Sequence, residues 1–285
     1  MRFAFKTSPQ NTTWSDMLAV WKAADDIEVF ESGWTFDHFY PIFSDPTGPC
    51  LEGWVTLTAL AQATTRLRVG VLVTGIHYRH PAVLANMAAS LDIVSGGRLE
   101  LGIGAGWNEE ESGAYGIELG TITERFDRFE EACQVLIGLL SQETTTFDGR
   151  FYRLTEARNE PKGPQRPHPP ICIGGSGEKR TLRITAQYAD HWNFVGGPPE
   201  EFARKRDVLA AHCADVGRDP KDIMLSAHVR LNAEHDYDRV LDEAGALGAE
   251  GLDLAIIYLP PPYDPAVLEP LAEKIRSSGL TSKQN

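Results

Sequence analysis

The chain has 285 residues, of which 42% are hydrophobic and 24% are charged. This is the composition of a globular protein with a sizeable core, and it excludes an intrinsically disordered chain, a collagen-like chain and a small disulfide scaffold. Lys and Arg number 27 against 40 Asp and Glu, which gives a formal net charge of −13. Because nucleic-acid backbones are bound mainly by basic side chains, this charge also excludes sequence-general nucleic-acid binding.

The apolar runs of the chain are short. Residues 69–74 and 252–259 fall well below the roughly 20 residues that a membrane helix needs, so no membrane span is predicted. The first residues read as a strand rather than an export signal, and we expect a cytoplasmic protein. The four cysteines form no C-x-x-C pair, which is typical of free thiols in a reducing compartment. They are Cys50, Cys133, Cys172 and Cys213.

Strand and helix signals alternate along the chain from its first residues. Residues 14–26 read as a helix with Thr13 as its cap, and residues 122–141 as a long amphipathic helix that begins near Thr121 or Thr123. The predicted strands are 2–6, 29–36, 67–74, 98–103, 171–173, 191–195, 223–229 and 252–259. The predicted helices are 14–26, 54–65, 81–94, 122–141, 178–188, 200–216, 237–247 and 265–277.

This repeated strand and helix pattern favours a (β/α)8 TIM barrel over an open, doubly wound sheet, since such barrels typically take about 250 residues. No linker or internal repeat divides the chain, so residues 1–285 are interpreted as a single domain. Residues 142–170 predict a hairpin-containing insertion between helix 4 and strand 5. In it, segments 144–147 and 151–154 flank Asp148-Gly149-Arg150, where Asp-Gly favours the positive φ of a tight turn.

In a barrel of this kind the active site lies at the carboxyl ends of the strands. After strand 2 stand Asp37 and His38, a carboxylate and an imidazole suited to proton transfer near neutral pH, although an exposed loop His with a capping Asp has the same pattern. After strand 5 stands the run from Gly174 to Gly177. Its backbone N–H groups could bind a phosphate at a helix N-terminus, or the run could be a plain tight turn.

Other polar groups in these loops are given simpler interpretations. His77 and His80 have no third ligand nearby, so no metal site is predicted. The run from Glu109 to Glu111 is interpreted as a solvated start of a helix, and Trp107 could stack on a planar ring. Neither the P-loop nor the dinucleotide-binding order of glycines is present, so the sequence gives no support to a Rossmann site.

Four segments together resemble the luciferase-like superfamily, and more closely its branch of coenzyme F420-dependent oxidoreductases. They are Thr35 to Phe39; Arg66 to Gly70 continuing to Pro81; Gly97 to Glu111; and Ile173 to Arg180 with Ala189 to Asn193. The resemblance extends from Arg2 to about Leu271. It implies a (β/α)8 barrel, commonly a homodimer, with the flavin or deazaflavin ring at the carboxyl-terminal mouth.

The resemblance also implies roles for single residues. A non-proline cis peptide is expected behind the ring, at or near Val71-Leu72, and Trp107 stands where some F420-dependent relatives have a proton-donating glutamate. The residues implied to contact the cofactor ring are Asp37, His38, Leu72, Val73, Thr74, Gly104, Gly106 and Trp107. The residues implied to receive the cofactor phosphate are Gly174, Gly175, Ser176 and Gly177.

We therefore expect an oxidoreductase that transfers a hydride between F420 and a small organic substrate, with His38 as the proton-transfer residue and Asp37 orienting it. An FMN-dependent two-component monooxygenase of the same superfamily is the first alternative, and a non-catalytic deazaflavin-binding protein the second. An unrelated aldolase-type barrel would need a catalytic lysine, for which Lys6 is the one candidate, more simply explained as a structural or surface residue. No residue selects the substrate.

Overall fold

The computed structural model describes residues 1–281, and its main sheet closes on itself. The order of its strands is β3-β2-β1-β11-β10-β9-β8-β5-β4, and a further pairing of β3 with β5, Val69 opposite Leu99, completes the ring. All of these pairs are parallel. The strands are β1 Arg2–Lys6, β2 Phe30–Thr35, β3 Arg68–Val71, β4 Thr74–Gly75, β5 Leu99–Gly104, β8 Ile171–Gly174, β9 His191–Phe194, β10 Met224–Arg230 and β11 Leu254–Tyr258.

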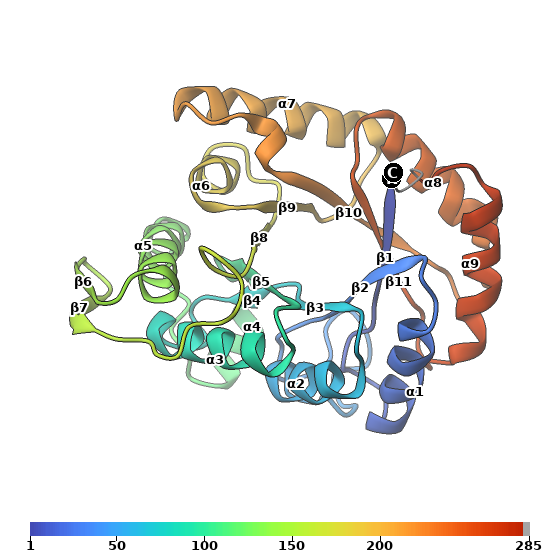
Figure 1. The fold of residues 1–285 in the computed structure, drawn as a ribbon, viewed down its shortest axis with the longest axis horizontal. Coiled ribbons are helices and arrows are strands. Elements are labelled where there is room, and N and C mark those ends of the chain that lie inside the picture. The colour runs from blue at the N-terminus through green and yellow to red at the C-terminus, as the bar shows by residue number, and fades with distance from the viewer. Residues whose placement is uncertain (282–285) are drawn as a thin grey trace.

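Short strands β3 and β4 share one position of the ring, so the barrel has eight strand positions and the predicted (β/α)8 fold is confirmed. Figure 1 shows the helices arranged around the strands. The helices are α1 Trp14–Asp25, α2 Gly53–Ala63, α3 Pro81–Val94, α4 Glu109–Ala114, α5 Ile122–Ser141, α6 Thr181–Tyr188, α7 Pro199–Asp215, α8 Tyr237–Ala249 and α9 Leu268–Ser277. Among residues 1–281, no helix combines the length and the apolar character that crossing a membrane requires.

The ends of several helices follow from their capping residues. Thr13 accepts a hydrogen bond from the Asp16 N–H at the start of α1, as predicted. At the start of α5, Thr121 and Glu124 form a reciprocal capping box, which decides between the two predicted caps. Helix α6 begins at Thr181, three residues later than predicted, and no side chain caps it.

The insertion projects beside α5 as an antiparallel hairpin of β6 Thr145–Asp148 and β7 Arg153–Ala157, at the edge of the molecule (Figure 1). The expected Asp-Gly turn with positive φ is wrong, because Gly149 has no positive φ. Instead the carboxylate of Glu131 on α5 accepts hydrogen bonds from three successive backbone N–H groups, those of Arg150 to Tyr152. A Cβ on Gly149 would lie 2.4 Å from a Glu131 carboxylate oxygen, so glycine is needed for this close approach.

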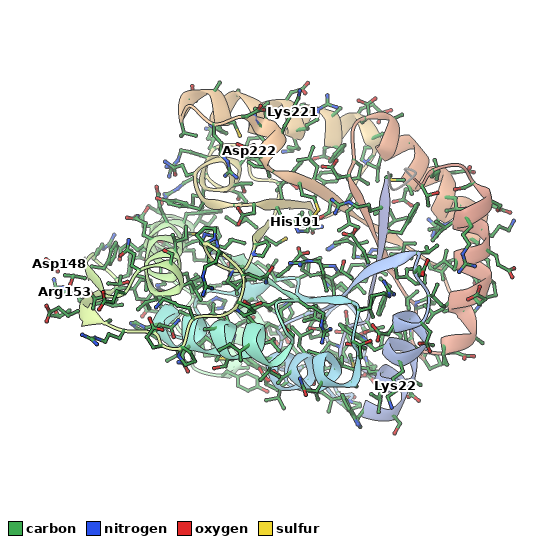
Figure 2. All side chains as sticks on the ribbon, in the orientation of Figure 1. Lys22, Asp148, Arg153, His191, Lys221 and Asp222 are labelled. Carbon is green, nitrogen blue, oxygen red and sulfur yellow. The ribbon has the colours of Figure 1, made fainter. Side chains whose placement is uncertain are left out.

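The strands are buried on both faces, which is why they read as almost continuous apolar runs. On β1, Phe3 and Phe5 face the helices, and Phe5 packs edge-on against Trp21 of α1 with ring centroids 5.3 Å apart. Ala4 faces the barrel interior with Trp34. Figure 2 shows how side chains fill the molecule, with His191 among the barrel strands and Asp148 and Arg153 on the outlying hairpin.

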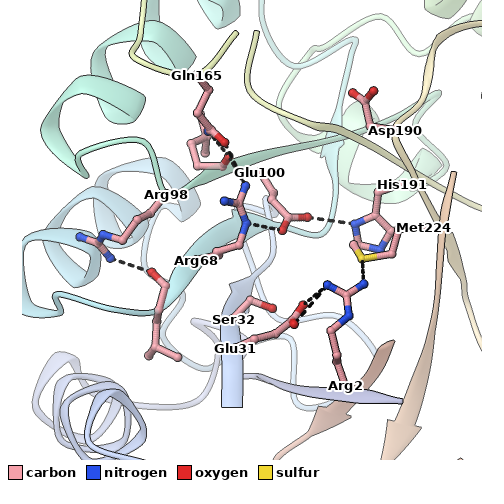
Figure 3. Close-up of polar contacts among 12 residues, drawn as sticks. Arg2, Glu31, Ser32, Arg68, Arg98, Glu100, Gln165, Asp190, His191 and Met224 are labelled. Carbon is pink, nitrogen blue, oxygen red and sulfur yellow. Dashed lines mark hydrogen bonds and ion pairs between the residues drawn. The ribbon is translucent and has the colours of Figure 1, made fainter. Parts of the chain in front are cut away.

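A cluster of polar side chains fills the amino-terminal end of the barrel (Figure 3). We call Arg68, Glu100, His191 and Ser226 the lower cluster. Glu100 is 3% exposed and receives Arg68 Nε at 2.8 Å on one oxygen and His191 Nδ1 at 3.0 Å on the other. His191 Nε2 lies 2.6 Å from Ser226 Oγ. Burial alone would raise the pKa of Glu100, but His191 and Arg68 lower it to about 2, so this buried carboxylate stays charged.

Candidate functional site

A cavity of about 760 Å³ opens at the carboxyl ends of the strands, where the active site of such a barrel is expected. This volume lies within the range of about 300–1,000 Å³ that small-molecule and cofactor sites occupy. The predicted site residues that line it are His38, Leu72, Val73, Gly104, Gly106, Trp107, Gly174 and Gly175. The predicted residues absent from its lining are Asp37, Thr74, Ser176 and Gly177.

His38 is held at the cavity wall by a buried glutamate. Its side chain follows β2, is 7% exposed, and places Nδ1 2.7 Å from Oε2 of Glu111 on α4. The other oxygen of Glu111 accepts a hydrogen bond from the backbone N–H of Phe39 at 2.6 Å, and the hydroxyl of Tyr78 donates to Oε2. Burial would raise the pKa of Glu111, yet the hydrogen bonds from His38, Tyr78 and Phe39 lower it, so the carboxylate is ionised at neutral pH.

Glu111 corrects the interpretation of its segment as a solvated run. Glu109 and Glu110 are exposed, but Glu111 has no exposed surface, because Asn108 caps α4 and turns the third glutamate inward. The Asn108 side chain accepts a hydrogen bond from the Glu111 N–H at 3.1 Å. The sequence signal for this arrangement is an Asn three residues before an acidic residue, which is a helix start.

Asp37 does not orient His38, so that expectation is wrong. Its carboxylate is fully buried and forms a two-point ion pair with Arg79, whose Nη2 donates to Oδ1 at 3.1 Å and whose Nη1 donates to Oδ2. Arg79 also reaches Glu52, at 3.4 Å, near the start of α2. Asp37 therefore ties the loops after β2 and β4 together behind the cavity wall.

The back of the cavity is the interrupted third strand. The cis peptide lies between Leu72 and Val73, one bond later than predicted. The Val73 side chain stands between two glycines: a Cβ on Gly104 would lie 2.9 Å from Val73 Cγ2, and one on Gly174 3.1 Å from Cγ1. Thr74 turns away and accepts a hydrogen bond from Trp54 Nε1 on α2 at 2.9 Å. A residue with a side chain at position 104 or 174 would therefore crowd Val73.

The glycine-rich loop after β8 keeps one unused polar group. Gly175 has φ of +121°, a conformation that side chains rarely adopt. Ser176 Oγ is buried and has no hydrogen-bond partner among the described residues. The Gly177 carbonyl accepts the Leu182 N–H at 3.0 Å at the start of α6. The loop thus offers a free hydroxyl near a helix start, although three residues separate its glycines from the helix.

Aromatic side chains flank the mouth of the cavity. The Trp107 ring lies edge-on to His38, with centroids 5.7 Å apart, and stacks on Phe43 with an interplanar angle of 3°. His77 places Nε2 3.1 Å from Ser112 Oγ, and burial lowers its pKa to about 4, while His80 caps α3. Among residues 1–281, no group of three or more His, Cys, Asp or Glu side chains is arranged to hold a metal ion.

Lys6 lies inside the barrel, so of its two interpretations, as a structural or as a surface residue, the surface alternative is wrong. It is 2% exposed, and Nζ donates to the Leu72 carbonyl at 2.7 Å and to the Tyr258 hydroxyl at 2.5 Å. Burial lowers the pKa of Lys6 to about 7, and the nearby positive charge of Arg230 acts in the same direction. Nothing in the sequence around Lys6 signals these contacts, since Tyr258 is 252 residues away.

Comparison with known proteins shows the family to which the chain belongs. The family described as luciferase-like monooxygenase matches residues 1–276. An F420-dependent glucose-6-phosphate dehydrogenase of Microbacterium testaceum is 28% identical over 85% of this chain and 71% of its own length. An F420-dependent hydroxymycolic acid dehydrogenase of Mycobacterium tuberculosis is 32% identical over 72% of this chain, and the match spans only 56% of that protein.

Solved structures share the fold. A structure described as an F420-dependent secondary alcohol dehydrogenase in complex with an F420–acetone adduct superposes with a TM-score of 0.80 and 19% identity. The superposition covers 90% of this chain and 93% of that one. At this identity the likeness establishes the barrel fold and its closure.

Proposed function

The chain belongs to the luciferase-like monooxygenase family, and from that premise we propose that it is an oxidoreductase that transfers a hydride between coenzyme F420 and a small organic substrate. The observation that carries the proposal is the cavity whose wall is formed by Val73 and the glycine-bearing ends of β5 and β8. Two F420-dependent relatives that match most of the chain support the choice of coenzyme.

The residues present fit a flat cofactor ring with a phosphate. Gly104 and Gly174 leave the apolar Val73 wall clear of side chains, so a planar ring can lie against it. Trp107 and Phe43 supply aromatic faces at the mouth. The Ser176 hydroxyl is buried, has no partner among the described residues and lies outside the cavity lining, and our proposal is that it donates to a phosphate oxygen when the cofactor binds.

When bound, F420 accepts or donates the hydride at C5 of its deazaflavin ring. Our assignment for the chain itself centres on His38. Because the ionised Glu111 lies beside Nδ1, it holds the ring proton there and leaves Nε2 to exchange a proton at the cavity. Glu111 places its negative charge 2.7 Å from Nδ1, opposite the positive charge that forms on the ring when Nε2 takes up a proton. Glu111 is a positioning residue, and Asp37 supports the loop only.

The test begins with parallel titrations of the purified protein with oxidised F420 and with FMN, followed by fluorescence. Selective, saturable binding of F420 supports the proposal. Selective binding of FMN, with oxygen consumption in the presence of reduced FMN, would instead identify a two-component monooxygenase of the same family. Tight F420 binding without turnover across a broad substrate panel would identify a non-catalytic deazaflavin-binding protein.

The second step tests His38. With a substrate found by screening against reduced F420, His38→Ala should reduce kcat by about 10²- to 10⁴-fold, the usual contribution of a proton-transfer residue, while F420 affinity changes little. Glu111→Gln keeps the side-chain volume and should shift the pH profile of kcat. Unchanged turnover in His38→Ala removes this residue from the mechanism.

Three broader features complete the proposal. We propose that residues 1–285 form one domain, that the protein is a homodimer, and that it acts in the cytoplasm. The four cysteines are free, and Cys133, Cys172 and Cys213 are buried, which suits a reducing compartment. Size-exclusion chromatography with light scattering measures the oligomeric state directly.

A further inference from the structure

The wall of the cavity opposite the glycines carries positive charge. Lys6, Arg230 and Tyr258 are the last residues of three adjacent strands and stand in one register row, Lys6 beside Tyr258 and Tyr258 beside Arg230. His228 lies two residues before Arg230 and so points to the same side of β10. All four side chains line the cavity, and we call them the cationic wall.

The two cations share one aromatic ring. Lys6 Nζ lies 4.5 Å and the Arg230 guanidinium carbon 4.8 Å from the centroid of the Tyr258 ring. A cation over an aromatic face is stabilised by the ring, but by far less than by a carboxylate. The positive charge of Arg230 lowers the pKa of Lys6, since like charges at close range repel.

Within residues 1–281, no carboxylate lies within ion-pair distance of this wall, and Glu243 on α8 interacts with Arg230 only at longer range. Neither Lys6 nor Arg230 has an ion pair there, and no Asp or Glu of the described chain lines the cavity. His228 adds no positive charge, because burial and the nearby Lys6 and Arg230 lower its pKa well below the ordinary value. Its Nε2 is buried and has no hydrogen-bond partner among the described residues. Lys6 is buried without a carboxylate partner, and Arg230 is exposed and lines the cavity without an ion pair, so this wall can accept a negatively charged ligand group.

Arg230 and Tyr258 lie away from the cofactor surface, whereas Lys6 reaches toward that surface and donates to the Leu72 carbonyl beside the cis peptide. In the closed ring of strands, β11 lies four positions from β5 in either direction, so Tyr258 and its neighbours are across the barrel from Gly104. Trp107, on the loop after β5, offers an apolar face to the same cavity. A ligand that fills the remaining space would thus have an anionic end at Arg230 and an apolar body.

Resting on the proposed function, we propose that Lys6 and Arg230 form a subsite for an oxyanion of the substrate, a carboxylate or a phosphate. The substrate class is then a small organic molecule whose reacting carbon lies beside the cofactor ring and whose negatively charged group lies at the cationic wall. Arg230 is exposed and can form two parallel hydrogen bonds to such a group, and an anion bound there would favour the charged form of the buried Lys6.

The test uses benzoate and benzamide, which have nearly the same shape and differ by one charge, together with inorganic phosphate. Calorimetric titrations of each into the full-length protein, with and without saturating F420, measure the affinities. Arg230→Met removes the exposed cation and leaves buried groups in place. Arg153→Met on the outlying hairpin removes the same charge far from the cavity and serves as the matched control (Figure 2).

Benzoate should bind about tenfold or more tightly than benzamide, and Arg230→Met should remove that difference while Arg153→Met keeps it. A preference for phosphate over benzoate would identify a phosphate monoester as the substrate class. Equal affinity for benzoate and benzamide, or an unchanged preference in Arg230→Met, overturns the subsite. If Arg230→Met weakens F420 binding by the same factor, the cation belongs to the cofactor and the substrate assignment is overturned. Failure of F420 to bind the unmodified protein rejects the proposed function, whereas the titrations without F420 still decide the subsite.

Discussion

The barrel contains two polar clusters, one at each end of its strands, and they differ in how their charges are balanced. In the lower cluster, the buried Glu100 contacts both Arg68 and His191 (Figure 3). His191 in turn contacts Ser226. In the cationic wall, Lys6 reaches only a carbonyl and a hydroxyl within the described chain, and Arg230 reaches only an aromatic face. The first cluster is complete by itself, whereas the second lacks an anion.

The pKa values reflect this difference. His191 and Arg68 overcome the effect of burial and lower the pKa of Glu100 to about 2, so the charged form is favoured. No such partner supports Lys6, and burial lowers its pKa to about 7, so the charged form is disfavoured. We infer that the lower cluster, whose charges are balanced, stabilises the fold, and that the cationic wall, whose charges are not, binds an anionic ligand group.

The largest expected effect is on stability at the lower cluster. Glu100→Ala leaves the half-buried Arg68 and the buried His191 without their anion, and it should reduce the free energy of unfolding by about 3 to 5 kcal/mol. Glu31→Ala removes the same charge from a partly exposed pair with Arg2 at the same end of the barrel and should cost less than about 1 kcal/mol. Urea unfolding of the two variants measures the contrast, and equal losses would show that the lower cluster is not stabilising.

Acid should remove the contribution of Glu100. Its folded-state pKa of about 2 lies below the ordinary 4.5, so its stabilisation is complete above pH 4.5 and is lost as the pH falls toward 2. The shift corresponds to about 3 kcal/mol. The difference in unfolding free energy between the unmodified protein and Glu100→Gln should therefore narrow over this interval, and a constant difference would contradict the low pKa.

Raising the pH above 7 should increase the free energy of unfolding through Lys6. Because its folded-state pKa of about 7 lies below the ordinary 10.5, the unfolded chain binds more protons between these values, and stability rises with pH. Between pH 7 and 9 this amounts to about 2 kcal/mol. Lys6→Met should lose that rise, measured as the difference in unfolding free energy from the unmodified protein. The same slope in both proteins would mean that Lys6 keeps its charge in the fold.

The barrel was predictable because its signals are local. Alternating apolar strands and amphipathic helices, the cap at Thr13 and the length of the 142–170 insertion can each be read within a short window. The same holds for the positions of the strand ends, which placed His38 and the glycines of β5 and β8 at the cavity. The cis peptide at Leu72–Val73 differed by one bond from the expectation, since its register depends on packing against Gly104.

The partners of the site residues were not predictable, because they come from distant segments. Glu111 meets His38 across 73 residues, and Arg79 meets Asp37 across 42. The adjacent Asp37 and His38 suggest a pair that acts together. Successive side chains at a strand end point in different directions, however, so Asp37 contacts Arg79 and His38 contacts Glu111. Likewise, nothing near Lys6 in the sequence shows that its neighbours carry no negative charge.

The smallest expected effect concerns the stability of the cationic wall itself. Arg230 is exposed and has no ion pair within residues 1–281, so Arg230→Met should change the free energy of unfolding by no more than about 0.5 kcal/mol. Loss of binding with unchanged stability separates a ligand contact from a structural one, because Glu100→Ala should do the reverse. A loss of several kcal/mol in Arg230→Met would instead place Arg230 with the structural cations of the lower cluster, and the contrast between the two ends of the barrel would fail.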